Sequence, residues 1–289
     1  MAIRELDIQK AVKEALIKAS TSFRPDQQVA YQRAIEKETK ESSRWILEKI
    51  LENAFIAEKN GLPLCDDTGI PYVLLEIGEN SDLSCKIDQI EASIYKGVAE
   101  GLRCLPGRPM AVKGNEWERL PQSKGLFEAP EMVLPAPIRI KSTKSKQFKI
   151  TLLMMGGGSE IRSRTDHLFH HHNVDAIKDG IILWAKEMVG LLGCTPCVLS
   201  VGIGRTHYEA TCLSMDALAE ATFGEENEFE LSITETINQT GVGSLGVGGR
   251  ITALGTFVKI GPQRASGVRI VNLRLGCCFD PRKASIILE

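Results

Sequence analysis

One short turn, residues 64–69, carries a thiol, two carboxylates and a hydroxyl. These groups belong to Cys65, Asp66, Asp67 and Thr68. A run with helical periodicity, residues 42–60, precedes the turn, and the apolar, β-branched run 70–77 follows it. We therefore expect a helix-to-strand connection closed by Gly69. Taken alone, the turn favours a structural explanation, in which the thiol is a small buried hydrophobe and the polar groups satisfy turn backbone.

Cysteines recur in pairs at two further places, each beside a glycine or proline at the end of a regular segment. The pairs are Cys194/Cys197 and Cys277/Cys278. Such positions are where a rigid scaffold presents ligands, but their sequence separations do not match a zinc ribbon or a ferredoxin. The first pair follows a helical segment and leads into a strand, whereas a thioredoxin-like redox pair precedes its helix. The remaining cysteines are expected to be core residues: Cys85, Cys104 and Cys212.

Two glycine-rich segments could present backbone groups. The triple glycine 156–158 follows a strand-like run and precedes Ser159 and Glu160. Its amides suit an anion such as a carboxylate, and a tight strand exit explains the pattern equally well. Residues 241–246 spell GxGxxG, but no strand clearly feeds them and no acidic residue lies about 20 positions later. A nicotinamide cofactor is therefore not expected.

The histidines offer a weaker alternative to the thiols. Four of them cluster at positions 167 and 170–172, and His167 would share a face with His171 if the segment were helical. No third-ligand motif stands at a recognisable spacing, so we rank a zinc site below the cysteine loci. His207 is an isolated candidate acid or base near Gly204.

Composition narrows the class of protein. The chain has 289 residues, a formal net charge of -2 and the apolar and charged fractions of a globular protein. That charge favours neither nucleic acid nor an anionic membrane as a partner, and no apolar run is long enough for a membrane span. The charged N-terminus does not resemble a signal peptide. We expect a cytoplasmic protein whose cysteines serve metal, redox or catalytic chemistry rather than disulfides.

The order of elements indicates a mixed α/β fold. Periodicity predicts two or three helices in 5–60, and others at 91–102, 173–192 and 208–223. Strands are predicted at 70–77, 138–155, 198–204, 251–260 and 268–275. Residues 111–137 read as a long functional loop. We expect a single compact domain over 1–289, with helices packed on a small mixed sheet and a mainly helical lead-in over 1–60.

Four separated stretches, spread over about residues 40–289, carry short motifs that can be considered together. They are Cys65-Asp-Asp-Thr-Gly69, Gly156-Gly-Gly-Ser-Glu160, Cys194-Thr-Pro with Val201-Gly-Ile-Gly204, and Ile237-Asn-Gln-Thr-Gly-Val-Gly243 continued by Gly248-Gly-Arg-Ile-Thr-Ala-Leu254. Together they resemble the iron–sulfur hydro-lyases that comprise class I fumarases and the alpha subunit of L-tartrate dehydratase. The order of the stretches is also the family's order.

This resemblance implies a [4Fe–4S] cluster held by three thiolates, two of them from Cys65 and Cys194. In the family pattern an arginine stands four residues after the third cysteine. Cys278 with Arg282 fits that pattern, so we prefer Cys278 to Cys277 as the third ligand. Three ligands leave one iron open to act as a Lewis acid on a substrate hydroxyl.

The resemblance also implies roles for other residues. Asp67 would handle a proton at the leaving hydroxyl or water, and Arg103, in a matching Gly-Leu-Arg, would clamp a carboxylate bidentately. The substrate-binding residues expected in this way are Asp66, Arg103, Gly157, Gly158 and Ser159. The expected function is that of an alpha subunit of a hydro-lyase that reversibly dehydrates a small 2-hydroxy dicarboxylate of the malate or tartrate type. The general base would come from a separate beta subunit, in a homodimer or an α2β2 assembly.

Departures from the family pattern concern the substrate pocket. Asp66 stands where Gln is common, Met155 where a Lys usually precedes the triple glycine, and Ile161 where Asn is usual. Arg205 replaces a Gly, and Gln263 lies where a His normally precedes Ala-Ser. The alternative function is therefore a non-catalytic or regulatory paralogue that keeps the fold, with or without the cluster.

Overall fold

The computed structural model describes residues 2–289, which split into two compact units. Unit 1 contains the described residues through Ser22, together with Ala57–Met155 and Arg282–Glu289, and unit 2 contains Phe23–Ile56 and Gly156–Pro281. The mixed α/β class and the helical N-terminal region are confirmed. The described strands form two four-stranded mixed sheets, one in each unit, where we expected one sheet in one compact domain. Each unit combines segments that are distant in the sequence, which local patterns do not reveal.

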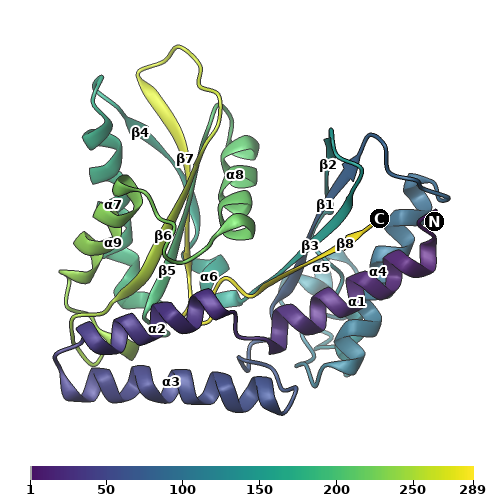
Figure 1. Cartoon of the computed structure of the whole chain (residues 1–289), viewed down its shortest axis with the longest axis horizontal. Coiled ribbons are helices and arrows are strands. Elements are labelled where there is room, and N and C mark those ends of the chain that lie inside the picture. Colours follow the sequence, from purple (N-terminus) through teal and green to yellow (C-terminus); the bar gives the residue numbers. More distant parts are fainter. Residues whose placement is uncertain (1) are drawn as a thin grey trace. The chain divides into compact units, whose positions relative to one another are not determined.

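The sheet of unit 1 has the strand order β2-β1-β3-β8 (Figure 1). Its strands are β1 (Ile70–Gly78), β2 (Arg139–Thr143), β3 (Phe148–Met155) and β8 (Lys283–Leu288). β1 pairs parallel with β2 and antiparallel with β3, which pairs antiparallel with β8. The register sets Ile70 opposite Met155 and Leu153 opposite Lys283. It therefore brings the turn at 64–69 and Arg282, which precede β1 and β8, to one end of the sheet.

Two helices of unit 1, α1 (Glu5–Thr21) and α4 (Ile87–Cys104), pack on this sheet. Alternate residues of β1 and β3 point to the same face and share a core with both helices. This core includes Ile8, Val12, Leu16, Val73, Leu75, Ile94, Val98, Phe148, Ile150 and Leu152. The helices approach closely at Gly97, where a Cβ would lie 2.7 Å from the Cβ of Val12. Any side chain at position 97 would therefore push α1 and α4 apart.

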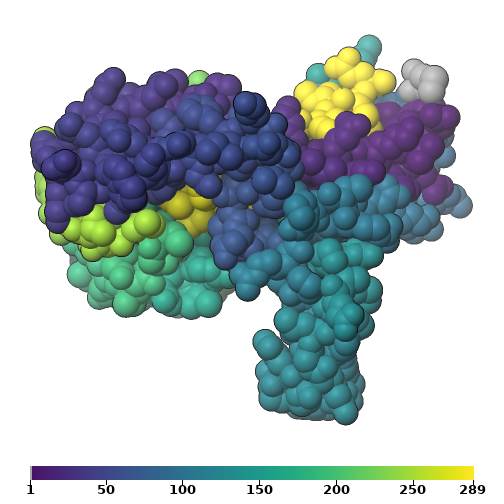
Figure 2. All heavy atoms as spheres, turned by 90° about the horizontal axis from the view of Figure 1, so that it is seen from below, coloured from purple at the N-terminus to yellow at the C-terminus, as the bar shows by residue number. Residues whose placement is uncertain are grey.

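The long loop predicted at 111–137 is present and contains two short turns, α5 (Glu116–Arg119) and η1 (Pro130–Met132). Asn115 caps α5 by accepting hydrogen bonds from the backbone N–H groups of Trp117 and Glu118. In the space-filling view the segment stands out as a teal arm (Figure 2). Trp117 on this arm is 78% exposed.

The sheet of unit 2 has the strand order β4-β7-β5-β6. Its strands are β4 (Arg164–Phe169), β5 (Cys197–Gly204), β6 (Ala253–Ile260) and β7 (Val268–Gly276). β5 pairs parallel with β6 and antiparallel with β7, and β7 pairs antiparallel with β4. Val198 lies opposite Gly276. The start of β5 and the end of β7, beside which the two cysteine pairs stand, therefore lie at the same end of the sheet.

Helices cover both faces of this second sheet (Figure 1). α7 (Val174–Leu192) and α9 (Glu228–Asn238) pack on one face, and α8 (His207–Glu220) packs on the other. Gly202 in β5 permits the close approach of α8, because a Cβ there would collide with the backbone of Ala210 and Ser214. The unit also contains α2 (Pro25–Lys37), α6 (Gly157–Arg162), η2 (Ser244–Gly246) and the part of α3 (Glu41–Lys59) through Ile56.

Two strands were not predicted. β4 and β8 are six-residue edge strands, and Phe169 in β4 is 62% exposed. The predicted helices and strand regions are present within about four residues of their expected positions, but the region 138–155 is divided into the two strands β2 and β3. No helix within residues 2–289 combines the length and apolar character needed to cross a membrane.

Candidate active site

Two of the candidate cysteine ligands meet in unit 2. The backbone N–H of Cys278 donates to the carbonyl of Cys194 over 2.9 Å, as the antiparallel pairing of β5 with β7 allows. Cys194 is exposed, Cys277 is half-buried and Cys278 is 6% exposed. The long separation of these cysteines in the sequence is thus closed by sheet topology.

α2 holds the segment that carries Cys278. The hydroxyl of Tyr31 donates to the carbonyl of Cys278 over 2.8 Å, and Nε2 of Gln27 donates to the carbonyl of Phe279 over 3.1 Å. Burial raises the pKa of Tyr31 well above its usual value, and the neighbouring side chains of Cys278, Cys277 and Cys194 raise it further. The Tyr31 phenol therefore stays protonated and remains a donor to this segment.

Asp280 connects this segment to the triple glycine. Its Oδ2 accepts hydrogen bonds from the N–H of Cys277 over 2.7 Å and from Oγ of Ser159 over 2.9 Å. Ser159 is 1% exposed, so its hydroxyl is committed to Asp280. Gly157 and Gly158 are exposed in the first turn of α6. The first turn of a helix suits an anion, because the helix dipole places partial positive charge there.

The turn at 64–69 belongs to unit 1 and is tightly built. Gly69 has φ +84°, and a Cβ there would lie 2.8 Å from the carbonyl oxygen of Met155. Oδ1 of Asp67 accepts from the N–H of Gly69 over 3.1 Å. Thr68 is 3% exposed, and its Oγ1 accepts from the N–H of Arg108 over 2.7 Å. Cys65 and Asp67 are half-buried at its surface, so both are accessible in part.

Arg282 binds the backbone of this turn with its side chain. Its side chain is buried, and Nη1 donates to the carbonyls of Asp67 and Thr68 over 2.7 and 3.3 Å. Among the described residues, its buried Nε and Nη2 atoms have no acceptor. A buried guanidinium with unpaired N–H groups is costly unless an anion meets it. The donor set beside the turn therefore fits an anionic group such as a thiolate-ligated iron–sulfur cluster or a carboxylate.

The charged substrate-binding candidates of unit 1 are already paired. Nε of Arg103 lies 3.0 Å from Oε1 of Glu131, and Nη1 of Arg108 lies 3.4 Å from Oδ2 of Asp66. The Asp66 side chain is 89% exposed. Both pairs are accessible to water, so each contributes little to stability and can open for a competing anion.

Several alternatives to a thiolate site lose support. Burial raises the pKa of Cys197 to about 12, so this thiol remains protonated and cannot serve a redox pair at neutral pH. His167 and His171 do not share a helix face, because His167 lies in β4 and His171, with φ +46°, lies in the loop after it. The core position expected for Cys104 is also wrong, because Cys104 is exposed.

No group of three or more His, Cys, Asp or Glu side chains within residues 2–289 is arranged to hold a metal ion. Cys65 lies in unit 1, and Cys194 and Cys278 lie in unit 2. The three-thiolate ligand set therefore remains a prediction.

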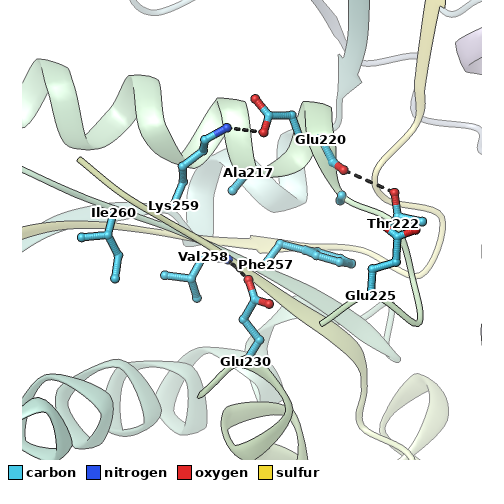
Figure 3. Close-up of a pocket in the computed structure, with 10 residues that line it drawn as sticks. Ala217, Glu220, Thr222, Glu225, Glu230, Phe257, Val258, Lys259 and Ile260 are labelled. Atoms are coloured by element: carbon cyan, nitrogen blue, oxygen red, sulfur yellow. Dashed lines mark hydrogen bonds and ion pairs between the residues drawn. The ribbon is translucent and has the colours of Figure 1, made fainter. Parts of the chain in front are cut away.

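A pocket of about 250 Å³ lies between α8 and β6 (Figure 3). Its charges are satisfied within unit 2. Lys259 forms an ion pair with Glu220, and the carboxylate of Glu230 accepts from the N–H groups of Val258 and Asn227 over 2.6 and 2.9 Å. This pocket is consequently explained by packing.

A buried carboxylate that the sequence did not single out anchors the glycine-rich segment 238–252. Glu38 is 0% exposed and lies between α2 and α3. Its donors are the backbone N–H groups of Thr39, Lys40, Arg250 and Ile251 and the hydroxyl of Ser43. Burial by itself would raise the pKa of Glu38, but these hydrogen bonds outweigh it and lower the pKa to about 2. Glu38 was missed because its surroundings, Glu-Lys-Glu-Thr-Lys-Glu, read as a solvated surface.

The Glu38 carboxylate is expected to make stability depend on acid. Its pKa is about 2 in the folded chain and 4.5 in its ordinary state, so its contribution is present above about pH 4.5 and is lost as the pH falls toward 2. The shift corresponds to about 3 kcal/mol. Urea unfolding of wild type and Glu38→Gln should differ most near pH 6, and the difference should shrink as the pH falls toward about 2.

The control for this prediction is Glu48→Gln on the exposed side of α3, which removes a charge without removing buried hydrogen bonds. A gap between wild type and Glu38→Gln that stays constant down to pH 2 would contradict the assignment of the low pKa to Glu38.

Comparison with known proteins supplies the family. The model of the family described as Fumarate hydratase (Fumerase) matches residues 9–286. The chain belongs to the fumarate hydratase family. The enzyme class expected from the sequence, a hydro-lyase of the fumarate hydratase or tartrate dehydratase type, is thereby confirmed at the level of the family.

Curated members of the fumarate hydratase family cover nearly the whole chain. A putative L(+)-tartrate dehydratase subunit alpha of Methanocaldococcus jannaschii is 32% identical over 281 residues, covering 95% of this chain and 94% of that protein. The L(+)-tartrate dehydratase subunit alpha of Escherichia coli K12 is 21% identical, over 86% of this chain and 80% of its own length. A putative fumarate hydratase class I of Geobacillus stearothermophilus is 24% identical, and the chain spans 56% of it.

Two departures from the family pattern have structural partners. Arg205 forms an ion pair with Glu209 over 2.7 Å at the start of α8. Nε2 of Gln263 donates to the carbonyls of Ile203 and Gly261 over 3.2 and 2.9 Å. Met155 is buried at the end of β3. Arg205 and Gln263 thus have partners within unit 2, and Met155 belongs to the core of unit 1.

Proposed function

We propose that the chain is the alpha subunit of an iron–sulfur hydro-lyase that reversibly dehydrates a small 2-hydroxy dicarboxylate of the malate/fumarate or tartrate type. The observation that carries the proposal is the 2.9 Å hydrogen bond that joins the backbones of Cys194 and Cys278 in a chain of this family. Two relatives named as alpha subunits match the chain over 94% and 80% of their lengths. A separate beta subunit is accordingly the proposed partner, in a homodimer or an α2β2 assembly.

The proposed cofactor is a [4Fe–4S] cluster held by the thiolates of Cys65, Cys194 and Cys278. The unpaired N–H groups of the buried Arg282, beside the turn that carries Cys65, support an anionic group of this kind. When bound through three thiolates, the cluster would supply an open iron that acts as a Lewis acid.

The chain's own residues would bind and orient the substrate and move one proton. Asp67 is the proposed proton carrier at the leaving hydroxyl, and its orientation is set by the N–H of Gly69 on Oδ1 and by Arg282 on its carbonyl. The exposed first turn of α6 at Gly157 and Gly158 would bind a substrate carboxylate by donating backbone N–H groups to it. Ser159 would contribute its backbone, because its hydroxyl is held by Asp280. Asp66 and Arg103 are the proposed charged contacts to the dicarboxylate.

Glu131→Gln is expected to strengthen substrate binding. In the structure the Glu131 carboxylate forms an ion pair with Arg103. A hydrogen bond from the backbone N–H of Glu131 and, to a smaller extent, one from Arg103 lower the pKa of the Glu131 carboxyl. Releasing Arg103 should lower KM for the dicarboxylate by up to about fivefold, the scale of one exposed ion pair, while kcat stays unchanged.

The matched variant is Arg103→Lys, which keeps the charge but cannot bind a carboxylate bidentately and should raise KM. Steady-state kinetics of both variants with a beta subunit present will test the role of Arg103. Unchanged KM in both would remove Arg103 from the substrate site.

Anaerobic reconstitution with iron and sulfide tests the proposed function. We expect about four irons per chain with a broad visible absorption, lost in Cys65→Ala, Cys194→Ala and Cys278→Ala. The reconstituted chain should then dehydrate a 2-hydroxy dicarboxylate once a beta subunit is added. A stable cluster without any hydration activity in that assembly would favour the non-catalytic paralogue, and no iron uptake by wild type would refute the proposed cofactor.

A further inference from the structure

The glycine-rich segment 238–252 is held on one side by Glu38. Oε2 of Glu38 accepts from the N–H groups of Arg250 and Ile251 over 2.8 and 3.0 Å. Gly249 makes this approach possible, because a Cβ there would lie 2.7 Å from Oε2 of Glu38 and 2.6 Å from Oγ of Ser43. Lys40 adds a hydrogen bond from Nζ to the carbonyl of Val247. The carboxylate thus fixes the backbone of this segment where it enters β6.

The same segment forms two hydrogen bonds with Thr195, the neighbour of Cys194. Oγ1 of Thr195 donates to the carbonyl of Gly243 over 2.6 Å, and the N–H of Leu245 donates to the carbonyl of Thr195 over 3.0 Å. Thr195 is 1% exposed, so both contacts are shielded from water. The position of Cys194 is therefore coupled to the position of the glycine-rich segment.

Ser43 connects the two contacts. Its hydroxyl donates to Oε2 of Glu38 over 3.0 Å and accepts from the N–H of Ser244 over 3.3 Å. Contacts thus lead from Glu38 through Ser43 to Ser244, whose chain neighbours Gly243 and Leu245 both bind Thr195. The series ends at Cys194, whose carbonyl accepts the N–H of Cys278.

The glycine-rich segment itself does not present its amides to a ligand. The N–H groups of Gly246, Val247, Gly248 and Gly249 donate to carbonyls within the segment, and that of Ser244 donates to Ser43. Substrate binding by a nest of unpaired amides is therefore a poor explanation for its five glycines with positive φ. Positioning of its neighbours is the better one.

We propose that Glu38 is a positioning residue that holds Cys194 and Cys278 in register through the glycine-rich segment. This proposal rests on the proposed function in one respect, since it assigns these cysteines to a metal-binding site. A carboxylate is needed because four backbone N–H groups and one hydroxyl converge on it. A glutamine would offer one oxygen and turn its NH₂ group toward N–H donors.

Amide hydrogen exchange on the full chain before reconstitution tests this coupling without any cofactor. In Glu38→Gln we expect the amides of Leu245 and Cys278 to exchange about tenfold faster than in wild type. Glu38→Asp keeps the charge with a shorter reach and should recover part of the protection. Ser43→Ala removes the connecting hydroxyl alone and should also release Leu245.

The matched control is Glu230→Gln. Glu230 is a buried carboxylate of unit 2 that also accepts two backbone N–H groups, but its contacts lead to Val258 and Asn227 (Figure 3). The Glu230→Gln variant should be less stable than wild type, but its Cys278 amide should exchange no faster. Faster exchange at Arg250 in Glu38→Gln with wild-type protection at Leu245 and Cys278 would overturn the proposal. The proposal would also be overturned if the Cys278 amide lost as much protection in Glu230→Gln as in Glu38→Gln.

A second readout uses the reconstituted chain. Glu38→Gln should lose iron to a chelator about tenfold faster than wild type, with Glu38→Asp between them and Glu230→Gln like wild type. Wild-type iron loss from Glu38→Gln would overturn the positioning role. If wild type takes up no iron, the proposed function fails, whereas the exchange measurement still decides whether Glu38 holds the two cysteines.

Discussion

Cys194→Ala is expected to abolish iron binding and to reduce hydro-lyase activity by on the order of a thousandfold, because the proposed cluster would supply Lewis-acid catalysis worth several kcal/mol. Cys194 is exposed at the start of the β5 segment, and its backbone carbonyl is bound by the N–H of Cys278. Removing its thiol leaves those backbone contacts intact. The chain should therefore stay folded while its iron content, measured after anaerobic reconstitution, falls toward zero.

Cys197→Ala is the control for this prediction. Cys197 is completely buried, and its raised pKa keeps the thiol protonated, so its loss should cost only some stability and leave iron content unchanged. Comparing Cys277→Ala with Cys278→Ala identifies the third ligand, for which we predict Cys278. Wild-type iron in Cys194→Ala would remove Cys194 from the ligand set.

Asp67→Asn is expected to lower kcat by about 10²–10⁴-fold without changing iron content, the range typical for loss of a general acid or base. An asparagine retains an oxygen that can accept the N–H of Gly69, and the Asp67 carbonyl still binds Arg282. The turn should therefore keep its shape, and the loss should reflect proton transfer. Steady-state kinetics combined with iron analysis separates the two effects.

Asp66→Asn provides the comparison, because it removes the neighbouring charge. The Asp66 side chain is 89% exposed and pairs with Arg108 at 3.4 Å, so its removal should alter KM for an anionic substrate and leave kcat nearly unchanged. Equal losses of kcat in both variants would show that Asp67 has no special part in proton transfer.

Local pattern predicted most elements of this fold because helices and half-buried strands repeat their apolar residues with fixed periods. The helix predicted at 173–192 is α7, and the strand predicted at 70–77 is β1. The sequence did not predict β4 and β8, which are edge strands of only six residues each. The division into two units escaped because β8 joins β3 from the far end of the chain, and no short-range signal marks such a pairing.

The residues of the candidate site also differ in whether they could be recognised from the sequence. The types of residue that can do chemistry were visible in the sequence, since thiols, carboxylates and glycines beside turns can be recognised locally. The supporting residues were not, because Glu38, Tyr31 and Asp280 acquire their roles only through burial against segments remote in sequence. A charged residue in a polar stretch looks the same whether it faces water or four backbone amides.

Local composition and the order of motifs were enough to recognise the family, the mixed α/β class and a short list of candidate ligands. The long-range contacts follow only from the folded chain: Cys194 and Cys278 are neighbours, Arg282 binds the turn at Asp67, and Arg103 is paired with Glu131. Sheet register and burial bring together groups whose separation along the chain carries no information about their separation in space.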